Sequence, residues 1–125
     1  MADYRVLLVD DEEEFVSALS ERLMLRGIEV DSTLNGEEAL ALMAEKVFEV
    51  VILDVMMPGL GGLEVLKQIK STHPNTQVIL LTGHGSTREG IEGMRLGAFD
   101  YLIKPVDIEE MLEKMKEAAK TVRPD

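Results

Sequence analysis

Three carboxylates, one hydroxyl and one amine stand at the ends of short apolar runs, and this combination could carry out phosphoryl transfer. The residues are Asp10, Asp11, Asp54, Thr82 and Lys104. Two like charges about 4 Å apart repel each other by about 4 kcal/mol at an effective dielectric constant of about 20. Three carboxylates brought together therefore need a cation, and a single lysine neutralises only one of them.

A hard divalent cation suits such a group, because carboxylates, retained waters and phosphate oxygens are the ligands that Mg²⁺ prefers. A divalent cation and a lysine beside a carboxylate are also what phosphoryl transfer to that carboxylate requires. The pattern predicts that Asp54 accepts a phosphoryl group with Lys104 and Thr82 beside it. The predicted cofactor is Mg²⁺, with Mn²⁺ as a substitute.

Each of these residues, taken alone, also has an ordinary structural explanation. Asp11 could cap a helix, because Glu14 follows it at the capping-box spacing. Asp54 could start a turn and Thr82 could be a loop residue, while Lys104 could be a solvated lysine. The conjunction favours chemistry, since four separate runs end in suitable residues.

The apolar runs before these residues are typical of β-strands. Residues 6–9, 50–53 and 78–81 are short and continuously apolar, as in strands that are buried on both faces. Residues 28–31 alternate strictly between apolar and polar, and residues 99–103 carry polar atoms early. These two runs therefore suit the edges of a sheet.

Amphipathic helical patterns separate the strands. The first three helices are marked by apolar residues at helical spacing: Phe15, Leu19 and Leu23; Leu40 and Met43; Leu63, Leu66 and Ile69. Gly27 ends the first helix, and the second begins near Asn35. Capping-box spacing marks the last two helices: Ser86 with Glu89, and Asp107 with Glu110.

The fourth helix, at about residues 87–96, contains Gly90 and Gly93. Each interior glycine costs a helix about 1 kcal/mol relative to alanine, so a loosely held helix is expected. Ile91 and Met94 are predicted to be the main members of its thin apolar stripe. The alternative is that the two glycines allow close packing.

Five strand–helix repeats predict an α/β fold with a doubly wound parallel sheet and helices on both faces. With the alternating strands at the edges, the strand order becomes 2-1-3-4-5, the flavodoxin-like order. Such sheets bind ligands at the carboxyl ends of the strands where the order reverses, here between the first and third strands. We expect residues 1–125 to form a single domain.

The composition excludes several classes of protein. The formal net charge is −11, which makes direct nucleic-acid binding unfavourable. The 125 residues include no cysteine, and no apolar run is long enough to span a membrane. Residues 1–5 do not resemble a signal peptide, so a cytoplasmic location with no membrane partner is expected.

Rival phosphate-binding motifs do not match the chain. The loop after the first strand, residues 10–13, is acidic and would repel the phosphates of a nucleotide or flavin. Residues 83–85 begin a G-x-G pattern but lack the later glycine spacing. The D-x-D motif of haloacid-dehalogenase-like phosphatases is absent at residues 54–56. His73 and His84 are predicted to be a solvated turn residue and a structural residue, respectively.

With these residues in place, the chain resembles the receiver domains of two-component response regulators, over about residues 5–119. The segments that carry the resemblance are VLLVDDE at 6–12, LDVMMPG at 53–59, LLTG at 80–83 and GAFDYLIKP at 97–105. No matched motif departs from the pattern of the family. His84 and Met56 stand where the family varies, which leaves the lifetime of the phosphorylated state open.

The resemblance implies a role for each acidic residue. Asp54 would accept the phosphoryl group from a phosphohistidine of a sensor histidine kinase or phosphotransfer protein. Asp10 and Asp11 would hold Mg²⁺ together with Asp54, with Asp11 the more direct ligand of the pair. The backbone carbonyl of Met56 would complete the coordination.

The resemblance also implies a switch. Lys104, fixed by a cis bond to Pro105, would contact the phosphoryl oxygens. Thr82 would turn its hydroxyl toward them, and Tyr101 would follow it inward. The change would reach an output domain or protein through the face formed by the fourth helix, fifth strand and fifth helix. Dimerisation through this face is an open alternative.

Three functions are therefore weighed. The first is a signalling switch that catalyses only its own phosphorylation and autodephosphorylation and is otherwise no enzyme. The second is a pseudo-receiver that only binds a partner, which the complete set of chemical residues disfavours. The third is a phosphoesterase, disfavoured because no segment is long enough for a substrate lid. A stand-alone protein and a piece of a longer regulator or hybrid kinase are both compatible with the sequence.

Overall fold

The fold alternates strands and helices along the whole described chain. The structure is a computed structural model that describes residues 4–83 and 87–122. Its elements are β1 (Arg5–Val9), α1 (Glu13–Met24), β2 (Glu29–Thr33), α2 (Gly36–Met43), β3 (Val50–Asp54), α3 (Gly62–Thr72), β4 (Gln77–Thr82), α4 (Thr87–Arg95), β5 (Asp100–Ile103) and α5 (Ile108–Val122).

All neighbouring strands pair in parallel, in the order β2-β1-β3-β4-β5. The predicted fold class, the strand order and the choice of edge strands are confirmed. The edge strands start one residue later than predicted, at Glu29 and Asp100. The residue before each strand packs into the core instead: Ile28 is buried, and Phe99 is partly buried.

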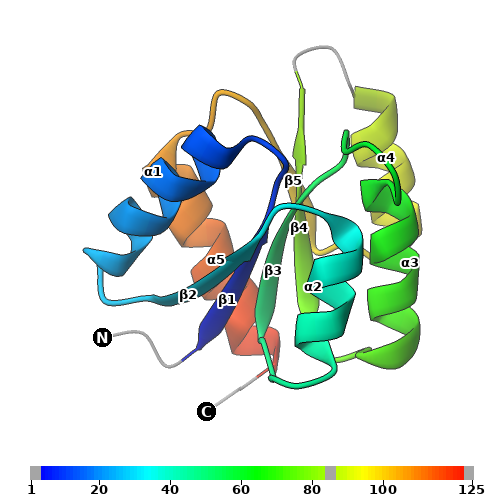
Figure 1. Cartoon of the computed structure of the whole chain (residues 1–125), viewed down its shortest axis with the longest axis horizontal. Coiled ribbons are helices and arrows are strands. Elements are labelled where there is room, and N and C mark those ends of the chain that lie inside the picture. Colours follow the sequence, from blue (N-terminus) through cyan, green and yellow to red (C-terminus); the bar gives the residue numbers. More distant parts are fainter. Residues whose placement is uncertain (1–3, 84–86, 123–125) are drawn as a thin grey trace.

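Helices cover both faces of the sheet (Figure 1). Helices α1 and α5 lie on one face, and α2, α3 and α4 lie on the other. Because successive strand residues point to opposite faces, β1 contributes to two apolar cores. Val6 and Leu8 pack with α1 and α5, whereas Leu7 and Val9 pack with α2 and α3. This double burial explains why the central strands are continuously apolar.

Some local predictions hold and others fail. Asn35 caps α2 by accepting a hydrogen bond from the Glu38 amide, and Asp107 accepts one from the Glu109 amide at the start of α5. In α1, however, the core position is taken by Val16, and Phe15 is only partly buried. The predictions for Ser86 and His84 fall outside the described residues.

The prediction for His73 holds in part: it lies in the turn after α3, where its carbonyl oxygen accepts a hydrogen bond from the Thr76 amide, but its side chain is partly buried rather than solvated. His73 follows the last residue of α3, and its Nε2 lies 3.1 Å from the carbonyl oxygen of Met43 at the end of α2. Because a carbonyl oxygen only accepts, Nε2 is the donor. The Nδ1 atom lies 2.8 Å from the Thr72 hydroxyl. His73 therefore joins the carboxyl-terminal ends of α2 and α3.

The predicted apolar stripe of α4 is also wrong. Ile91 and Met94 are 55% and 42% exposed, so they point away from the core. Gly90 and Gly93 are buried and face the sheet instead. The alternative reading of the glycines, close packing, therefore describes this helix.

The close approach of α4 leaves no room for larger residues. A Cβ atom at Gly90 would lie 2.8 Å from the ring of Tyr101 on β5. A Cβ atom at Gly93 would overlap the Leu80 side chain on β4. The backbone of α4 thus rests directly on side chains of the sheet.

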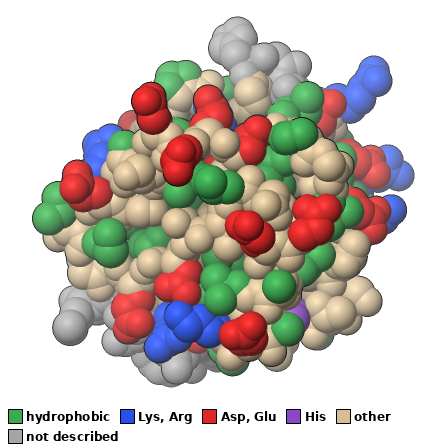
Figure 2. Space-filling model, in the orientation of Figure 1, with side chains coloured by type: hydrophobic (Ala, Val, Ile, Leu, Met, Phe, Trp, Pro, Cys, Tyr) green, Lys and Arg blue, Asp and Glu red, His purple; other side chains and the backbone are tan. Residues whose placement is uncertain are grey.

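Acidic side chains are more frequent than basic ones on the face seen in Figure 2, in keeping with the net charge of −11. In the part of the chain that the structure describes, we find no helix with both the length and the apolar character of a membrane span.

Candidate functional site

Each predicted site residue lies at or just after the carboxyl end of a strand. Asp10 and Asp11 follow β1, and Asp54 is the last residue of β3. Thr82 is the last residue of β4, and Lys104 follows β5. Since the strands are parallel, their carboxyl ends lie on one edge of the sheet, and the site forms there.

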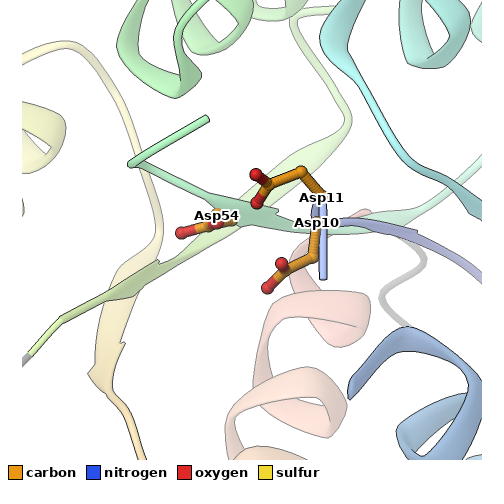
Figure 3. A group of neighbouring side chains, drawn as sticks. All are labelled: Asp10, Asp11 and Asp54. Carbon is orange, nitrogen blue, oxygen red and sulfur yellow. The ribbon is translucent and has the colours of Figure 1, made fainter. Parts of the chain in front are cut away.

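The three aspartates form a compact acidic group. One carboxylate oxygen of each of Asp10, Asp11 and Asp54 lies within 4.8 Å of the other two. Figure 3 shows the three side chains leaving the ends of β1 and β3 toward the same side. Asp10 is 0% exposed and Asp54 is 5% exposed, whereas Asp11 reaches solvent. The group therefore opens to the surface through Asp11.

Backbone amides hold the two buried carboxylates in place. The Glu12 amide donates to Asp10 Oδ1 over 2.9 Å, and the Met56 amide donates to Asp54 Oδ1 over 3.2 Å. Gly62, the first residue of α3, packs directly against the backbone at the end of β3. A Cβ atom there would overlap the carbonyl oxygen of Asp54. Each buried carboxylate is thus held by the amide two residues further along, where the chain leaves the strand.

Asp11 does not cap the first helix. Helix α1 begins at Glu13 after Glu12, and no side chain caps its first turn. The structural explanation weighed for Asp11 is therefore absent, and its exposed carboxylate is available to a ligand. Its predicted role as a metal ligand stays a prediction, as does that of the Met56 carbonyl.

Lys104 approaches the acidic group from β5, and its bond to Pro105 is cis, as expected. Its Nζ atom lies 2.8 Å from Asp10 Oδ2 and 3.9 Å from Asp54 Oδ2. The same amine donates a hydrogen bond of 2.8 Å to Glu12 Oε1. The single positive charge of Lys104 is therefore shared among the carboxylates of Asp10, Glu12 and Asp54.

The acidic group is electrostatically strained. Burial and the nearby charge of Asp10 raise the pKa of Asp54 to about 6, although the amine of Lys104 opposes the rise. Burial lowers the pKa of Lys104, but its contacts with Asp10 and Glu12 outweigh this effect and raise it overall. The amine therefore stays charged, and the carboxylates retain an excess of negative charge.

The buried oxygen Asp10 Oδ2 fits a cation ligand. It accepts no hydrogen bond from the described residues, because the nearby Lys104 amine lies outside hydrogen-bonding geometry and makes only an ion pair with it. A buried acceptor without a hydrogen bond is uncommon in folded proteins. With three carboxylates around it, the donor set is that of a hard divalent cation.

Thr82 is the last residue of β4, and Tyr101 lies on the neighbouring strand β5. Thr82 is fully buried, and its hydroxyl donates to the carbonyl oxygen of Leu102 over 3.4 Å. Tyr101 is partly buried, and its ring lies against Gly90 of α4. Of these two residues, Tyr101 is the one whose ring contacts α4.

The sequence reasoning missed Glu12 and Phe15. Glu12 binds the Lys104 amine, and the Phe15 ring centroid lies 4.7 Å from the same nitrogen. Glu12 directly follows the acidic pair, which was a usable signal. The contact with Phe15 depends on where the segment after β5 places Lys104, which the sequence pattern does not define.

The comparisons with known proteins agree on one family. A family model described as the response regulator receiver domain matches residues 6–116. The chain is 42% identical over 113 residues to the uncharacterized transcriptional regulatory protein YkoG of Bacillus subtilis, covering 90% of this chain and 50% of that protein. It is 42% identical over 112 residues to the transcriptional regulatory protein CpxR of Klebsiella pneumoniae, covering 90% and 47%.

Solved structures give the same result. The receiver domain of the Francisella response regulator 1452 matches with a TM-score of 0.89 and 32% identity, covering 97% of this chain and 100% of that one. A response regulator receiver domain protein from Clostridium thermocellum matches with a TM-score of 0.89 and 34% identity, covering 94% of each chain. The chain spans about half the length of the curated relatives it matches. It belongs to the response regulator receiver domain family, and thus to two-component signalling.

Proposed function

We propose that the chain is a phosphorylation-controlled signalling switch whose phosphate acceptor is Asp54. The observation that carries the proposal is the meeting of three carboxylates within 4.8 Å, with the Lys104 amine 3.9 Å from Asp54 Oδ2. A pseudo-receiver would not need this set of charges. A binding partner alone gives no reason to bury two carboxylates beside each other.

The proposed reaction moves a phosphoryl group from a phosphohistidine to Asp54. A carboxylate oxygen of Asp54 attacks phosphorus and forms an O–P bond while the N–P bond of the donor breaks. The electron pair of that bond stays on the imidazole nitrogen, and Asp54 becomes an acyl phosphate. With a pKa of about 6, Asp54 is mostly ionised at neutral pH and able to attack.

Asp10, Asp11 and Asp54 would hold Mg²⁺, with the Met56 carbonyl as a further ligand and Mn²⁺ as a substitute. When bound, the cation supplies positive charge to the carboxylates and to the phosphoryl oxygens. Lys104 would bind a phosphoryl oxygen from the side of β5. The buried Asp10 Oδ2, which accepts no hydrogen bond, supports this arrangement.

The proposed output starts at Thr82. Its hydroxyl would leave the Leu102 carbonyl oxygen, the present acceptor at 3.4 Å, and turn to the phosphoryl group. Tyr101 would move inward and leave the surface of Gly90. The change would then reach the face formed by α4, β5 and α5, where a partner or a second copy would bind.

The proposed partners are a sensor histidine kinase or phosphotransfer protein, and a downstream output domain or protein. Relatives about twice as long as this chain are named transcriptional regulatory proteins, which supports an output that controls transcription. The domain itself would catalyse only its own phosphorylation and autodephosphorylation.

Mass spectrometry of the intact chain tests the proposal. Incubation with phosphoramidate and Mg²⁺ is expected to add one phosphoryl group, and Asp54→Asn should abolish the addition because the attacking carboxylate is lost. Glu13→Gln is the control, since Glu13 is exposed and lies in the first turn of α1. A wild-type chain that neither gains a phosphoryl group nor consumes the donor would favour the pseudo-receiver, and steady consumption of the donor without an adduct would favour the phosphoesterase.

A further inference from the structure

We propose that Glu12 is a positioning residue that keeps Lys104 in a resting site away from Asp54. The resting site consists of Asp10 Oδ2, Glu12 Oε1 and the ring of Phe15. The proposal rests on the proposed function, because it concerns how Lys104 becomes available for phosphoryl transfer. It assigns to Glu12 control over the rate of phosphorylation.

Distances place the amine in the resting site. Lys104 Nζ lies 2.8 Å from Glu12 and 2.8 Å from Asp10, but 3.9 Å from Asp54. Only the Glu12 contact has the geometry of a hydrogen bond. The amine is therefore held by Asp10 and Glu12 at equal distances and lies farther from Asp54.

The local structure frees Glu12 for this contact. Glu12 is the residue before α1, a position that Ser, Thr, Asp and Asn favour because their short side chains cap the helix, and the Glu12 side chain makes no capping bond. Its amide is held by Asp10 Oδ1 over 2.9 Å, which fixes the backbone. The carboxylate is thus directed to Lys104 by a backbone that the acidic group itself holds.

Phe15 forms the third wall of the resting site. The Lys104 amine lies 4.7 Å from the centroid of its ring, within the range of a cation–π contact. Phe15 is partly buried and packs against the core formed with α1 and α5, so it lies between that core and the Lys104 amine. Three contacts from the β1–α1 segment therefore hold an amine that belongs to the end of β5.

Phosphoryl transfer would require the amine to move. To bind an oxygen of a phosphoryl group on Asp54, Lys104 must give up its hydrogen bond with Glu12. The Glu12 side chain is 63% exposed, so the bond is weak enough to break readily. Each phosphorylation would include this exchange of partners, and the fraction of molecules with a free amine would limit the rate.

The test is the rate of phosphorylation by phosphoramidate in Glu12→Gln, with Glu13→Gln as the control. Both substitutions remove one negative charge from neighbouring exposed residues, but only the first removes the partner of Lys104. At saturating donor, we expect Glu12→Gln to react about two- to fivefold faster, which corresponds to the strength of a partly exposed ion pair. A general effect of charge on the anionic donor would change the half-saturating concentration in both variants alike.

A second measurement reports on the amine without any reaction. The NMR signals of the Lys104 side chain should shift in Glu12→Gln and stay unchanged in Glu13→Gln. Glu12→Asp should restore part of the wild-type rate and chemical shift. A rate in Glu12→Gln equal to or slower than that of the wild type, or an unchanged lysine signal, would overturn the proposal.

The two proposals fail in distinguishable ways. If the wild-type chain gains no phosphoryl group, the proposed function is wrong. The lysine signals then still decide whether Glu12 holds the amine. If the wild-type chain is phosphorylated but the Glu12 variants have the same phosphorylation rate and the same Lys104 signals as the wild type, only the resting site is wrong.

Discussion

At the scale of single residues, the pKa of the Asp54 carboxyl group is shifted far from its ordinary value. Its ordinary pKa of 3.8 rises to about 6, mainly because the folded chain buries it beside Asp10. Folding therefore favours the protonated form of Asp54 over the ionised form. Its contribution to stability is fully present below its ordinary pKa and is lost as the pH rises through about 6.

We expect this loss in the chain without divalent cations. Between about pH 5 and about pH 7.5, Asp54→Asn should gain about 1 to 2 kcal/mol of unfolding free energy relative to the wild type. Urea unfolding of both proteins in a chelating buffer measures the difference. A difference that does not change with pH would show that Asp54 is not desolvated as the structure indicates.

The sequence identified most of the residues at the site, because chemistry at strand ends follows from residue type and topology. Asp10, Asp11, Asp54 and Lys104 all meet at the predicted edge. What the sequence did not reveal is which carboxylate binds the amine. That choice depends on two segments far apart in the sequence: the turn between β1 and α1, which directs Glu12, and the loop after β5, which places Lys104.

At the scale of elements, strands were easier to predict than α4. A central strand buried on both faces has a continuous apolar pattern that hardly any other element shares. Helix α4 instead buries two glycines, and glycines carry no apolar side chain for a pattern to register. The hydrophobic pattern therefore predicted that the face with Ile91 and Met94 is buried, whereas the face with the two glycines is.

The packing of α4 leads to a stability prediction. Gly93→Ala should destabilise the chain by about 1 to 3 kcal/mol, because the added methyl group overlaps Leu80 in a closely packed core. Chemical unfolding in urea measures the change. The matched control is Gly61→Ala, whose added Cβ has no atom within 4 Å. Equal stability of the two variants would contradict the close approach of α4.

At the scale of the whole molecule, the charge balance links ligand binding to stability. The chain carries a formal net charge of −11, and three carboxylates are concentrated at one edge of the sheet. Repulsion among them opposes folding, and a bound cation would relieve it. The free energy of unfolding should therefore rise as the concentration of a divalent cation rises.

We expect Mg²⁺ to raise the thermal unfolding temperature near neutral pH. At one hundred times the dissociation constant, the added stability would be about 2.7 kcal/mol. Asp11→Asn should reduce this gain, since Asp11 is the exposed member of the acidic group, whereas Glu13→Gln should preserve it. An equal gain in all three proteins would mean that Mg²⁺ binds elsewhere.

The glycine-lined contact of α4 has a mechanical consequence. Helices usually interlock through ridges of side chains, and a shift then requires those ridges to leave their grooves. At Gly90 and Gly93 the helix presents a flat strip of backbone to Tyr101 and Leu80. Because α4 touches the Tyr101 ring through its backbone at Gly90, with no side chain between them, an inward movement of that ring would remove a direct support of the helix.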